Sequence, residues 1–574
     1  MALTPETLSF KTRLAHDLSI IIPTHVSSNV ITAYLATLLY HSYPKHKREN
    51  IQLEPQLTEW IQLGKPYIYQ LKNLWTTLSA HFNDEQQIPD EIILKILQPI
   101  EYILQDGGDE RTYLNEETQL GKYSTSMFPR ENIIDLSSCT ANNITQSAYA
   151  KAYQLREKWL KIIFNEKGDI KKILTEAHVT LKKKLIELLG IEQTYDIILS
   201  PSGTDAEYMP NYLIESLHPD KHIINIVISP LEIGSGSSLA ASDCFFSIQL
   251  PDNSSVNTFE KIRSSNVEEI KYVSLRDQNG DIKSQQQLYL ELFPIVKEHD
   301  HLNVAIIIHL VDSAKTGIGG PSLNTISQLE DALVHAKVYK IVDAAQFRIA
   351  RENIDAYADD NTFIIITGSK FIGAPPFCGA VLVPKNISLN MLESPPPQGL
   401  KHFYNDIFFP DSMLNIAKKF PSDINTGLLI RWLLAFDTIE QFYQLGSNNV
   451  KSIVSEIYHE LNHVFSQHDH CIVLNEPLLT RNNNHFWDEI PTIYSIEIIH
   501  SKTKEKLDFH ELTVLFKLLK DKHDCHLGQP VKISPSRAVL RLALSANHII
   551  EYNDNKKLLI DKFKKTLSLV DALI

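Results

Sequence analysis

The stretches that decide the fold are YKIVDAAQ, residues 339–346, and TFIIITGSK, residues 362–370. Each opens with a mainly apolar run of strand length and ends in small or polar residues. Such runs are typical of parallel strands that helices cover on both faces. In sheets of this kind ligands bind beyond the carboxyl ends of the strands, so Asp343 and Lys370 stand where chemistry is expected.

Four similar runs occur outside these two stretches, and helical stretches separate them. They cover residues 196–199, 222–229, 304–310 and 379–383. This alternation predicts an α/β fold with a mainly parallel sheet.

The ends of the chain differ in texture from its middle. The patterns at 54–79 and 89–105 predict a helical N-terminal extension without a recognisable chemical motif. A helix predicted at 427–445 leads into helices and short strands, which indicates a smaller C-terminal α+β domain. The predicted division is therefore an extension at 1–125, a large α/β domain at 126–400 and a small domain at 401–574.

Composition argues against several kinds of partner. The chain has 574 residues, a formal net charge of -14 and a pI near 5.9, which disfavours nucleic acid and anionic lipid as partners. Polar residues interrupt the apolar stretch at 18–40, so no membrane span is expected. The start MALTPETLSF lacks the pattern of a signal peptide. Five scattered cysteines without a CxxC pair fit free thiols in the cytoplasm.

A turn of small residues, SPSGTDAE, follows the run at 196–199. It is predicted to open a helix, where the hydroxyls and backbone N–H groups of Ser202, Gly203 and Thr204 could bind a phosphate. An ordinary helix N-cap uses the same residue types, so the turn alone leaves both interpretations open.

Asp343 and Lys370 offer complementary chemistry. A carboxylate at the edge of a buried strand requires a cationic partner, and a protonated pyridine nitrogen is one such partner. Arg348 or a helix N-terminus is another. A lysine at the mouth of a buried strand can be held as the free amine that attacks aldehydes. Lys370 is therefore a candidate for a Schiff-base lysine.

In their order and spacing these segments resemble fold-type I pyridoxal phosphate (PLP) enzymes, particularly the class V aminotransferase and cysteine desulfurase group. The resemblance covers roughly residues 195–385 and implies the PLP-dependent transferase (aminotransferase-like) fold with a seven-stranded sheet. It implies that Lys370 holds PLP as a Schiff base, that Asp343 pairs with the pyridine nitrogen and that Gln346 contacts the ring hydroxyl. The other cofactor-binding residues implied there are Ser202, Gly203, Thr204, Thr367 and Ser369.

Weaker similarities extend this resemblance. The segment TGIGGP, residues 316–321, resembles a turn that places Ser313 near the substrate. Asn425 and Thr426 resemble residues that reach the phosphate of the neighbouring subunit, which implies a homodimer with shared active sites. Arg541 resembles the arginine that binds the substrate carboxylate as a bidentate ion pair. The competing arginines are Arg348, Arg351 and Arg537.

One run departs from the family pattern. In SPLEIGSG, residues 229–236, an aliphatic or small residue stands where a histidine would stack on the ring. The reaction type is therefore not inherited. We expect an enzyme acting on an amino acid or related amine, with aminotransferase-type chemistry as the main interpretation.

Two alternatives remain open. The first is a cysteine desulfurase or another β- or γ-elimination lyase. A desulfurase needs a thiolate on a mobile loop, and Cys525 between His523 and His526 is the candidate. The second is a catalytically inactive PLP-fold protein that acts by binding.

A rival motif lies at residues 459–463, where HELNH matches the HExxH pattern of zinc proteases. The apolar stripe of the same helix predicts that His459 faces away from the core. No glycine-rich continuation with a third histidine follows. We therefore expect no metal site.

Overall fold

A computed structural model describes residues 98–574 together with Ile92, Lys95 and Ile96, except for gaps at 116–117, 119, 131, 165–167, 263–266, 392–393 and 482–484. The chain divides into two compact units. The first comprises residues 1–129, 144–180 and 424–430, and the second comprises 130–143, 181–423 and 431–574. Each unit combines distant segments, and the division into three consecutive domains stays a prediction.

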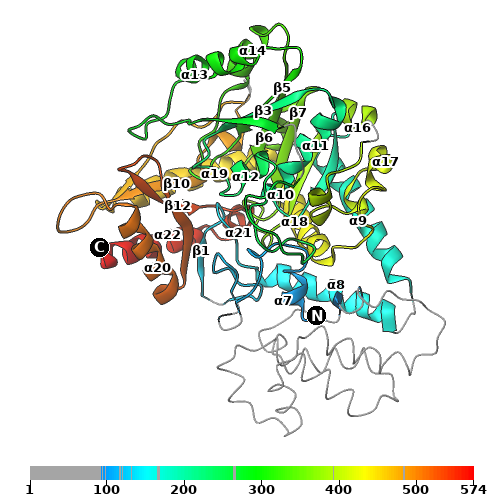
Figure 1. The fold of residues 1–574 in the computed structure, drawn as a ribbon. Coiled ribbons are helices and arrows are strands. Elements are labelled where there is room, and N and C mark those ends of the chain that lie inside the picture. The colour runs from blue at the N-terminus through cyan, green and yellow to red at the C-terminus, as the bar shows by residue number, and fades with distance from the viewer. Residues whose placement is uncertain are drawn as a thin grey trace. The chain divides into compact units, whose positions relative to one another are not determined.

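A seven-stranded sheet dominates the second unit, with the strand order β2-β8-β7-β6-β5-β3-β4 (Figure 1). β8 is antiparallel to both of its neighbours, and all other neighbouring pairs are parallel. The strands are β2 (Tyr195–Ser200), β3 (His222–Ile228), β4 (Val267–Val273), β5 (Val304–Val311), β6 (Lys337–Ala344), β7 (Thr362–Thr367) and β8 (Gly379–Pro384). The predicted α/β fold with a mainly parallel, seven-stranded sheet is confirmed.

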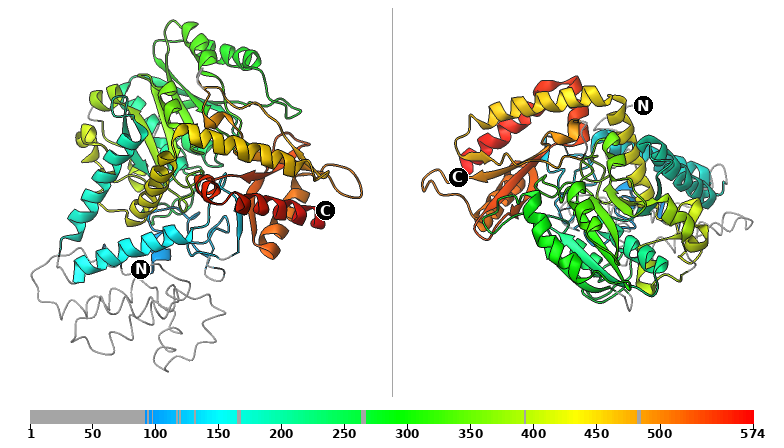
Figure 2. Two further views of the ribbon diagram at one scale, coloured as in Figure 1. Left: turned by 180° about the vertical axis from the view of Figure 1, so that it is seen from behind. Right: turned by 90° about the horizontal axis from the view of Figure 1, so that it is seen from above.

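All six predicted runs form strands, and their burial explains why the sequence shows them. Every residue of β5, β7 and β8 is buried. Helices lie on both faces of this sheet, as the views from behind and above also show (Figure 2). The strand that sequence analysis missed, β4, lies at the edge of the sheet and reads VEEIKYV. Charged residues interrupt the apolar run of this strand. An edge strand tolerates them because it has a neighbouring strand on one side only.

The second unit also contains a five-stranded sheet with the order β1-β11-β12-β10-β9. β1 is parallel to β11, and the other neighbours are antiparallel. Its strands are β1 (Ile134–Leu136), β9 (Cys471–Val473), β10 (Ile493–Ile498), β11 (Cys525–Lys532) and β12 (Ala538–Ala543). Helix α20 packs on β11 and β12. Aromatic contacts join Tyr494 of β10 to Phe465 and Phe563 of two further helices.

The helices of the second unit alternate with these strands. They are α10 (Gly203–Ala206), α11 (Tyr208–Leu217), α12 (Ser237–Ala241), α13 (Gln285–Glu298), α14 (Leu323–Asp331), α15 (Arg351–Ile354), α16 (Lys385–Asn390), α17 (Leu414–Ala417), α19 (Ser447–Phe465), α20 (Phe509–His523), α21 (Ala546–Asp554) and α22 (Lys556–Leu573). Two more helices, α9 (Ile170–Leu189) and α18 (Thr426–Gln444), contribute residues to both units.

The described part of the first unit combines helices with turns. It contains α7 (Ile100–Ile103) and α8 (Gln146–Phe164). The Tyr149 hydroxyl donates to Glu101 at 2.8 Å, and Arg156 donates to the carbonyls of Ile96 and Gln98. The predicted helical segment at 54–79 lies outside the described residues, and α7 is the described part of the segment predicted at 89–105.

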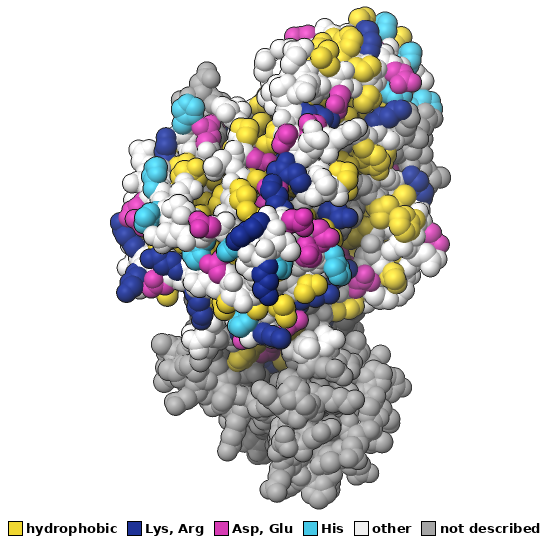
Figure 3. Space-filling view, turned by 90° about the vertical axis from the view of Figure 1, so that its left-hand side faces the viewer, with side chains coloured by type: hydrophobic (Ala, Val, Ile, Leu, Met, Phe, Trp, Pro, Cys, Tyr) yellow, Lys and Arg dark blue, Asp and Glu magenta, His cyan; other side chains and the backbone are white. Residues whose placement is uncertain are grey.

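The described surface carries charges of both signs. On the face that Figure 3 shows, Lys and Arg side chains are intermingled with Asp and Glu. Among the described residues, no helix is long and apolar enough to cross a membrane.

Candidate active site

The carboxyl ends of the central strands bring the predicted phosphate turn to Thr367. Gly379 of β8 pairs with Ser200 of β2 on one side and with Thr367 of β7 on the other. The turn after Ser200 then approaches β7 so closely that a Cβ at Gly203 would lie 2.8 Å from Thr367 Cγ2 and 3.2 Å from Ala345 Cβ. The two segments assigned to the phosphate are therefore in contact.

The turn opens a helix, as predicted. Ser202 is the N-cap of α10, and its hydroxyl accepts from the Asp205 amide at 3.2 Å. The loop after β3 closes on the same turn, because a Cβ at Gly236 would lie 2.9 Å from Thr204 Cγ2. The run at 229–236, which lacks the expected histidine, thus borders the site.

Asp343 lies at the carboxyl end of β6, between Val311 of β5 and Ile365 of β7. Protein surrounds its carboxyl group closely, yet the residue keeps some accessible surface. Burial raises the pKa of the carboxyl group, while Lys370 and the Ala345 amide, which donates to it at 3.0 Å, act in the opposite direction. The charged carboxylate therefore lacks full compensation from its surroundings.

A buried polar group that sequence analysis missed lies beside Asp343. His309 of β5 is two residues before the strand partner of Asp343, so both side chains project from the same face of the sheet. Its Nδ1 lies 3.1 Å from Glu207 Oε2, and its Nε2 lies 2.6 Å from Asn225 Oδ1. Burial raises the pKa of Glu207, and the His309 contact opposes that rise. The apolar run that contains His309 offered no signal of this contact.

The segment carrying Lys370 is held by its backbone. Asn142 donates through Nδ2 to the carbonyls of Ser369 and Lys370 at 2.7 and 2.8 Å. The Ser369 hydroxyl is buried and has no hydrogen-bond partner among the described residues. Thr367 donates its hydroxyl to the Ala345 carbonyl at 2.6 Å. The structure thus gathers Asp343 and Lys370 at one sheet edge and leaves a neighbouring hydroxyl available.

Gln346 and Arg348 are engaged with the segment around β1. Gln346 donates to the Cys139 carbonyl at 3.0 Å, and Arg348 donates to the Ser138 hydroxyl at 2.9 Å. Arg348 also donates to Thr492 and Leu544. Arg348 therefore joins several segments and does not pair with Asp343.

Arg541 is buried on β12 and is placed differently from its competitors. It donates to the carbonyls of Gln529 and Lys315 at 2.8 and 2.9 Å and to the Thr140 hydroxyl at 3.2 Å. Burial lowers the pKa of its guanidinium group. Arg537, in contrast, forms ion pairs with Glu497 and Asp281, and Arg351 is exposed.

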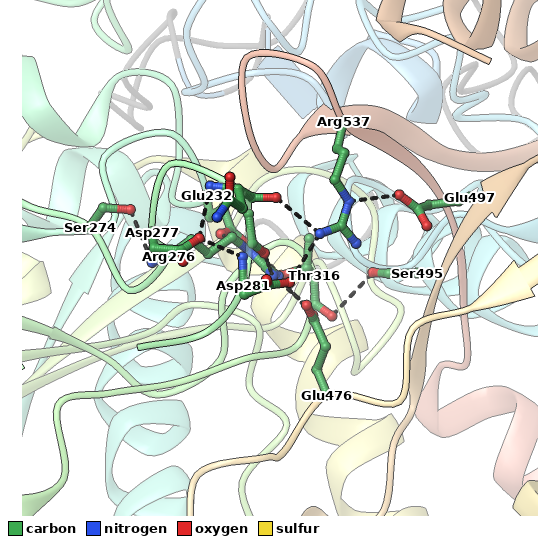
Figure 4. A network of polar contacts seen from close by, with 12 residues as sticks. Glu232, Ser274, Arg276, Asp277, Asp281, Thr316, Glu476, Ser495, Glu497 and Arg537 are labelled. Atoms are coloured by element: carbon green, nitrogen blue, oxygen red, sulfur yellow. Dashed lines mark hydrogen bonds and ion pairs between the residues drawn. The ribbon is translucent and has the colours of Figure 1, made fainter. Parts of the chain in front are cut away.

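A buried ion-pair network joins the loops that follow the strands, and sequence analysis did not predict it (Figure 4). Arg276 after β4 donates to Glu232 at 2.6 Å and to Glu476 at 2.7 Å, and it also donates to Thr316 at 3.1 Å. Burial opposes the charge of Arg276, but the two carboxylates outweigh burial and raise its pKa. The network fixes the loop at 229–236 and the segment around Lys315.

Three predicted site residues remain: Ser313, Asn425 and Thr426. Ser313 is buried just after β5, where the Asp312 amide donates to the Asp343 carbonyl at 3.0 Å. Asn425 belongs to the first unit, where it donates to the Gly107 carbonyl at 2.9 Å and accepts from the Leu428 amide. Thr426 begins α18. The role of these three residues stays a prediction.

The five cysteines are free and buried. Cys525 begins strand β11 and lies 3.6 Å from the Thr566 hydroxyl, and burial raises its thiol pKa to about 11. The expectation that Cys525 sits on a mobile loop as a thiolate is therefore wrong. The flanking histidines suggested a lowered thiol pKa. The residues that bury Cys525 are distant in sequence, so the local sequence offers no sign of them.

The HExxH segment lies on α19, where His459 and His463 are exposed and the predicted apolar stripe is buried. Among the described residues, no group of three or more His, Cys, Asp or Glu side chains is placed to hold a metal ion.

Comparisons with known proteins gave matches only among solved structures. No family model and no curated protein matches the chain. The crystal structure of the cysteine desulfurase CsdA from Escherichia coli is 12% identical over 77% of this chain and 95% of that chain, with a TM-score of 0.46. A NifS-like protein is 12% identical over 76% of this chain and 99% of that chain, with a TM-score of 0.43.

Proposed function

We propose that the protein is a PLP-dependent enzyme that acts on an amino acid or a related amine through Lys370. One observation carries this proposal: the turn at Gly203 after β2, Asp343 of β6, and Thr367 and Lys370 at the end of β7 converge at one sheet edge. A lone lysine or a lone capping turn would carry little weight.

The residues present fit this cofactor. The buried Ser369 hydroxyl has no partner among the described residues, and the close approach at Gly203 leaves no room for a side chain there. Ser202, Thr204 and Thr367 would hold the phosphate at the turn. Asp343, whose pKa burial raises, would face the ring nitrogen, since a cation there compensates its charge.

PLP, when bound, withdraws electrons from the substrate carbon next to the amine. Lys370 would hold the cofactor covalently and, once the substrate amine replaces it, accept or return a proton at its Nζ atom. Asn142 keeps this lysine in place through two backbone carbonyls. Arg541 would orient the substrate by its carboxylate.

Transamination and cleavage of a carbon–sulfur bond are the two candidate reactions. Both use the same residues, and the choice depends on which substrate bond stands perpendicular to the ring. The cysteine placement bears on the second candidate. Because all five thiols are buried, carbon–sulfur cleavage by this chain would release sulfide directly instead of passing sulfur to one of its own exposed thiols.

The proposal is tested by the visible absorption spectrum of the purified protein supplied with PLP. We expect a band that borohydride bleaches and that Lys370→Ala lacks, with a shift on adding amino acids. Sulfide released from cysteine then identifies carbon–sulfur cleavage, whereas transfer of the amino group to an added keto acid identifies transamination. A protein that shows no such band after PLP is added contradicts the proposal.

A further inference from the structure

Arg541 has unused hydrogen-bonding capacity toward an anion. A guanidinium group carries five N–H donors, one on Nε and two on each terminal nitrogen. The described residues supply three acceptors, one for each nitrogen, and all three are uncharged. Each terminal nitrogen therefore keeps one donor, and no described carboxylate forms an ion pair with Arg541. A buried guanidinium group in this state favours an anionic ligand.

A second cation, Lys315, lies beside Arg541. Its carbonyl accepts from Arg541 Nη1, and its amide donates to the Glu232 carbonyl at 2.7 Å. Among the described residues, its Nζ reaches only the Leu231 carbonyl at 3.4 Å, longer than a good hydrogen bond. Protein surrounds the side chain closely, yet the residue keeps some accessible surface. Lys315 is therefore a partly accessible cation beside Arg541.

The charges around Lys315 do not balance. The groups that act on its ammonium are the cations Arg541 and Lys370 and the carboxylates Glu232 and Asp343. Glu232 is committed to the buried Arg276. If Asp343 faces the cofactor nitrogen, no carboxylate of this group is left for Arg541 or Lys315. An anionic group of a substrate would supply the missing negative charge.

We propose that Arg541 and Lys315 bind two separate anionic groups of one substrate. The substrate class is then an amino acid whose side chain ends in a carboxylate, sulfinate or similar anion. This inference rests on the proposed function, because it assigns Arg541 to the α-carboxylate and Lys315 to the side chain. Nothing in the sequence motifs singled out Lys315.

Dicarboxylates without an amino group test the two cations independently of the cofactor chemistry. Succinate and glutarate should bind the PLP-supplied protein, in calorimetric titrations, at least about tenfold more tightly than butyrate and valerate. Lys315→Met should abolish that preference, whereas Lys315→Arg should keep it. Lys184→Met, which removes an exposed lysine, is the matched control and should leave it unchanged.

The second measurement uses the absorption band. L-aspartate or L-glutamate should shift it at concentrations about 10- to 100-fold lower than L-asparagine or L-glutamine, and only in proteins with a cation at position 315. Equal binding of succinate and butyrate by the wild-type protein would overturn the inference. So would Lys315→Met if it lowered PLP retention while dicarboxylate binding stayed intact. Failure of the proposed function is a separate result, because it appears as a missing band.

Discussion

At the scale of single residues, the site combines the buried carboxylate of Asp343 with the cations Lys370, Arg541 and Lys315. Asp343 is surrounded by protein, and the charge of Lys370 acts to lower its pKa. Among the described residues, neither Arg541 nor Lys315 forms an ion pair with a carboxylate. Charges in such surroundings destabilise the empty site and favour ligands of opposite charge. Two predictions follow from individual pKa directions.

The first concerns Asp343→Asn. Burial raises the pKa of Asp343, so its ionised form opposes folding in the cofactor-free protein at every pH above the unfolded pKa of about 4. We expect the cofactor-free variant to melt at a higher temperature than the wild type at pH 7 and at the same temperature near pH 3. Turnover with PLP should fall at least about 100-fold. Unchanged turnover would remove Asp343 from the mechanism.

The second concerns the pH dependence of dicarboxylate binding. The pKa of Lys315 is lowered to about 8, mainly by burial and also by Arg541 and Lys370, while Glu232 and Asp343 oppose this shift. The ammonium that binds the anion is therefore lost as the pH rises through about 8. Succinate affinity, measured between pH 6 and pH 10, should decline above that pH. Lys315→Arg should remove the decline, and a decline that persists in this variant contradicts the assignment.

At the scale of elements, close packing and buried ion pairs hold the strand-end loops. The contact of the α10 turn with β7 depends on the missing side chain of Gly203. Arg276 holds the loops after β3, β4 and β5 to the segment after β9. A single substitution can disrupt the Gly203 contact or the Arg276 network.

Gly203→Ala tests the contact between the turn and β7. The new methyl group would lie 2.8 Å from Thr367 Cγ2, so the turn must move. We expect a loss of about 1–3 kcal/mol in the free energy of unfolding and PLP affinity at least about tenfold weaker. Gly121→Ala, where the nearest atom lies at 3.4 Å, is the control and should change neither quantity appreciably.

Arg276→Met tests the network in Figure 4. The variant leaves Glu232 and Glu476 without their cation, and Glu232 is only 4% exposed. Denaturant unfolding should show a loss of about 3–5 kcal/mol. Arg537→Met removes an arginine that is 25% exposed and should lose less than about 1 kcal/mol. Equal losses in the two variants would show that burial does not decide the strength of these pairs.

At the scale of the whole molecule, the predicted homodimer with shared active sites is the main open feature. Asn425 and Thr426 belong to the first unit, and Lys370 belongs to the second. If Asn425 serves the site of a partner chain, two inactive variants should complement each other in a mixed dimer.

Mixing Lys370→Ala with Asn425→Ala tests this prediction. Half of the randomly mixed dimers contain both variants, and one of their two sites is intact, so activity should recover to about a quarter of the wild-type value. Each variant alone should stay nearly inactive. Light scattering that shows a monomer, or a mixture without recovery, contradicts shared sites.

The sequence alone determined six of the seven strands of the large sheet and placed Asp343 and Lys370 near the carboxyl ends of two of them. The runs that end at Asp343 and Lys370 are apolar because helices cover both faces, and this is a local signal that needs no partner. The edge strand β4 escaped notice because its charged residues break that signal.

Only the tertiary structure decided which polar groups meet. Arg276 and Glu476 are 200 residues apart, and Arg541 and Lys315 are 226 apart, so no local pattern joins them. The same holds for Cys525, the candidate loop thiolate whose flanking histidines suggested a lowered pKa, because it lies buried at the start of β11 beside Thr566. Hydrophobic periodicity is carried by neighbouring residues, whereas charge pairing depends on the long-range contacts that folding creates.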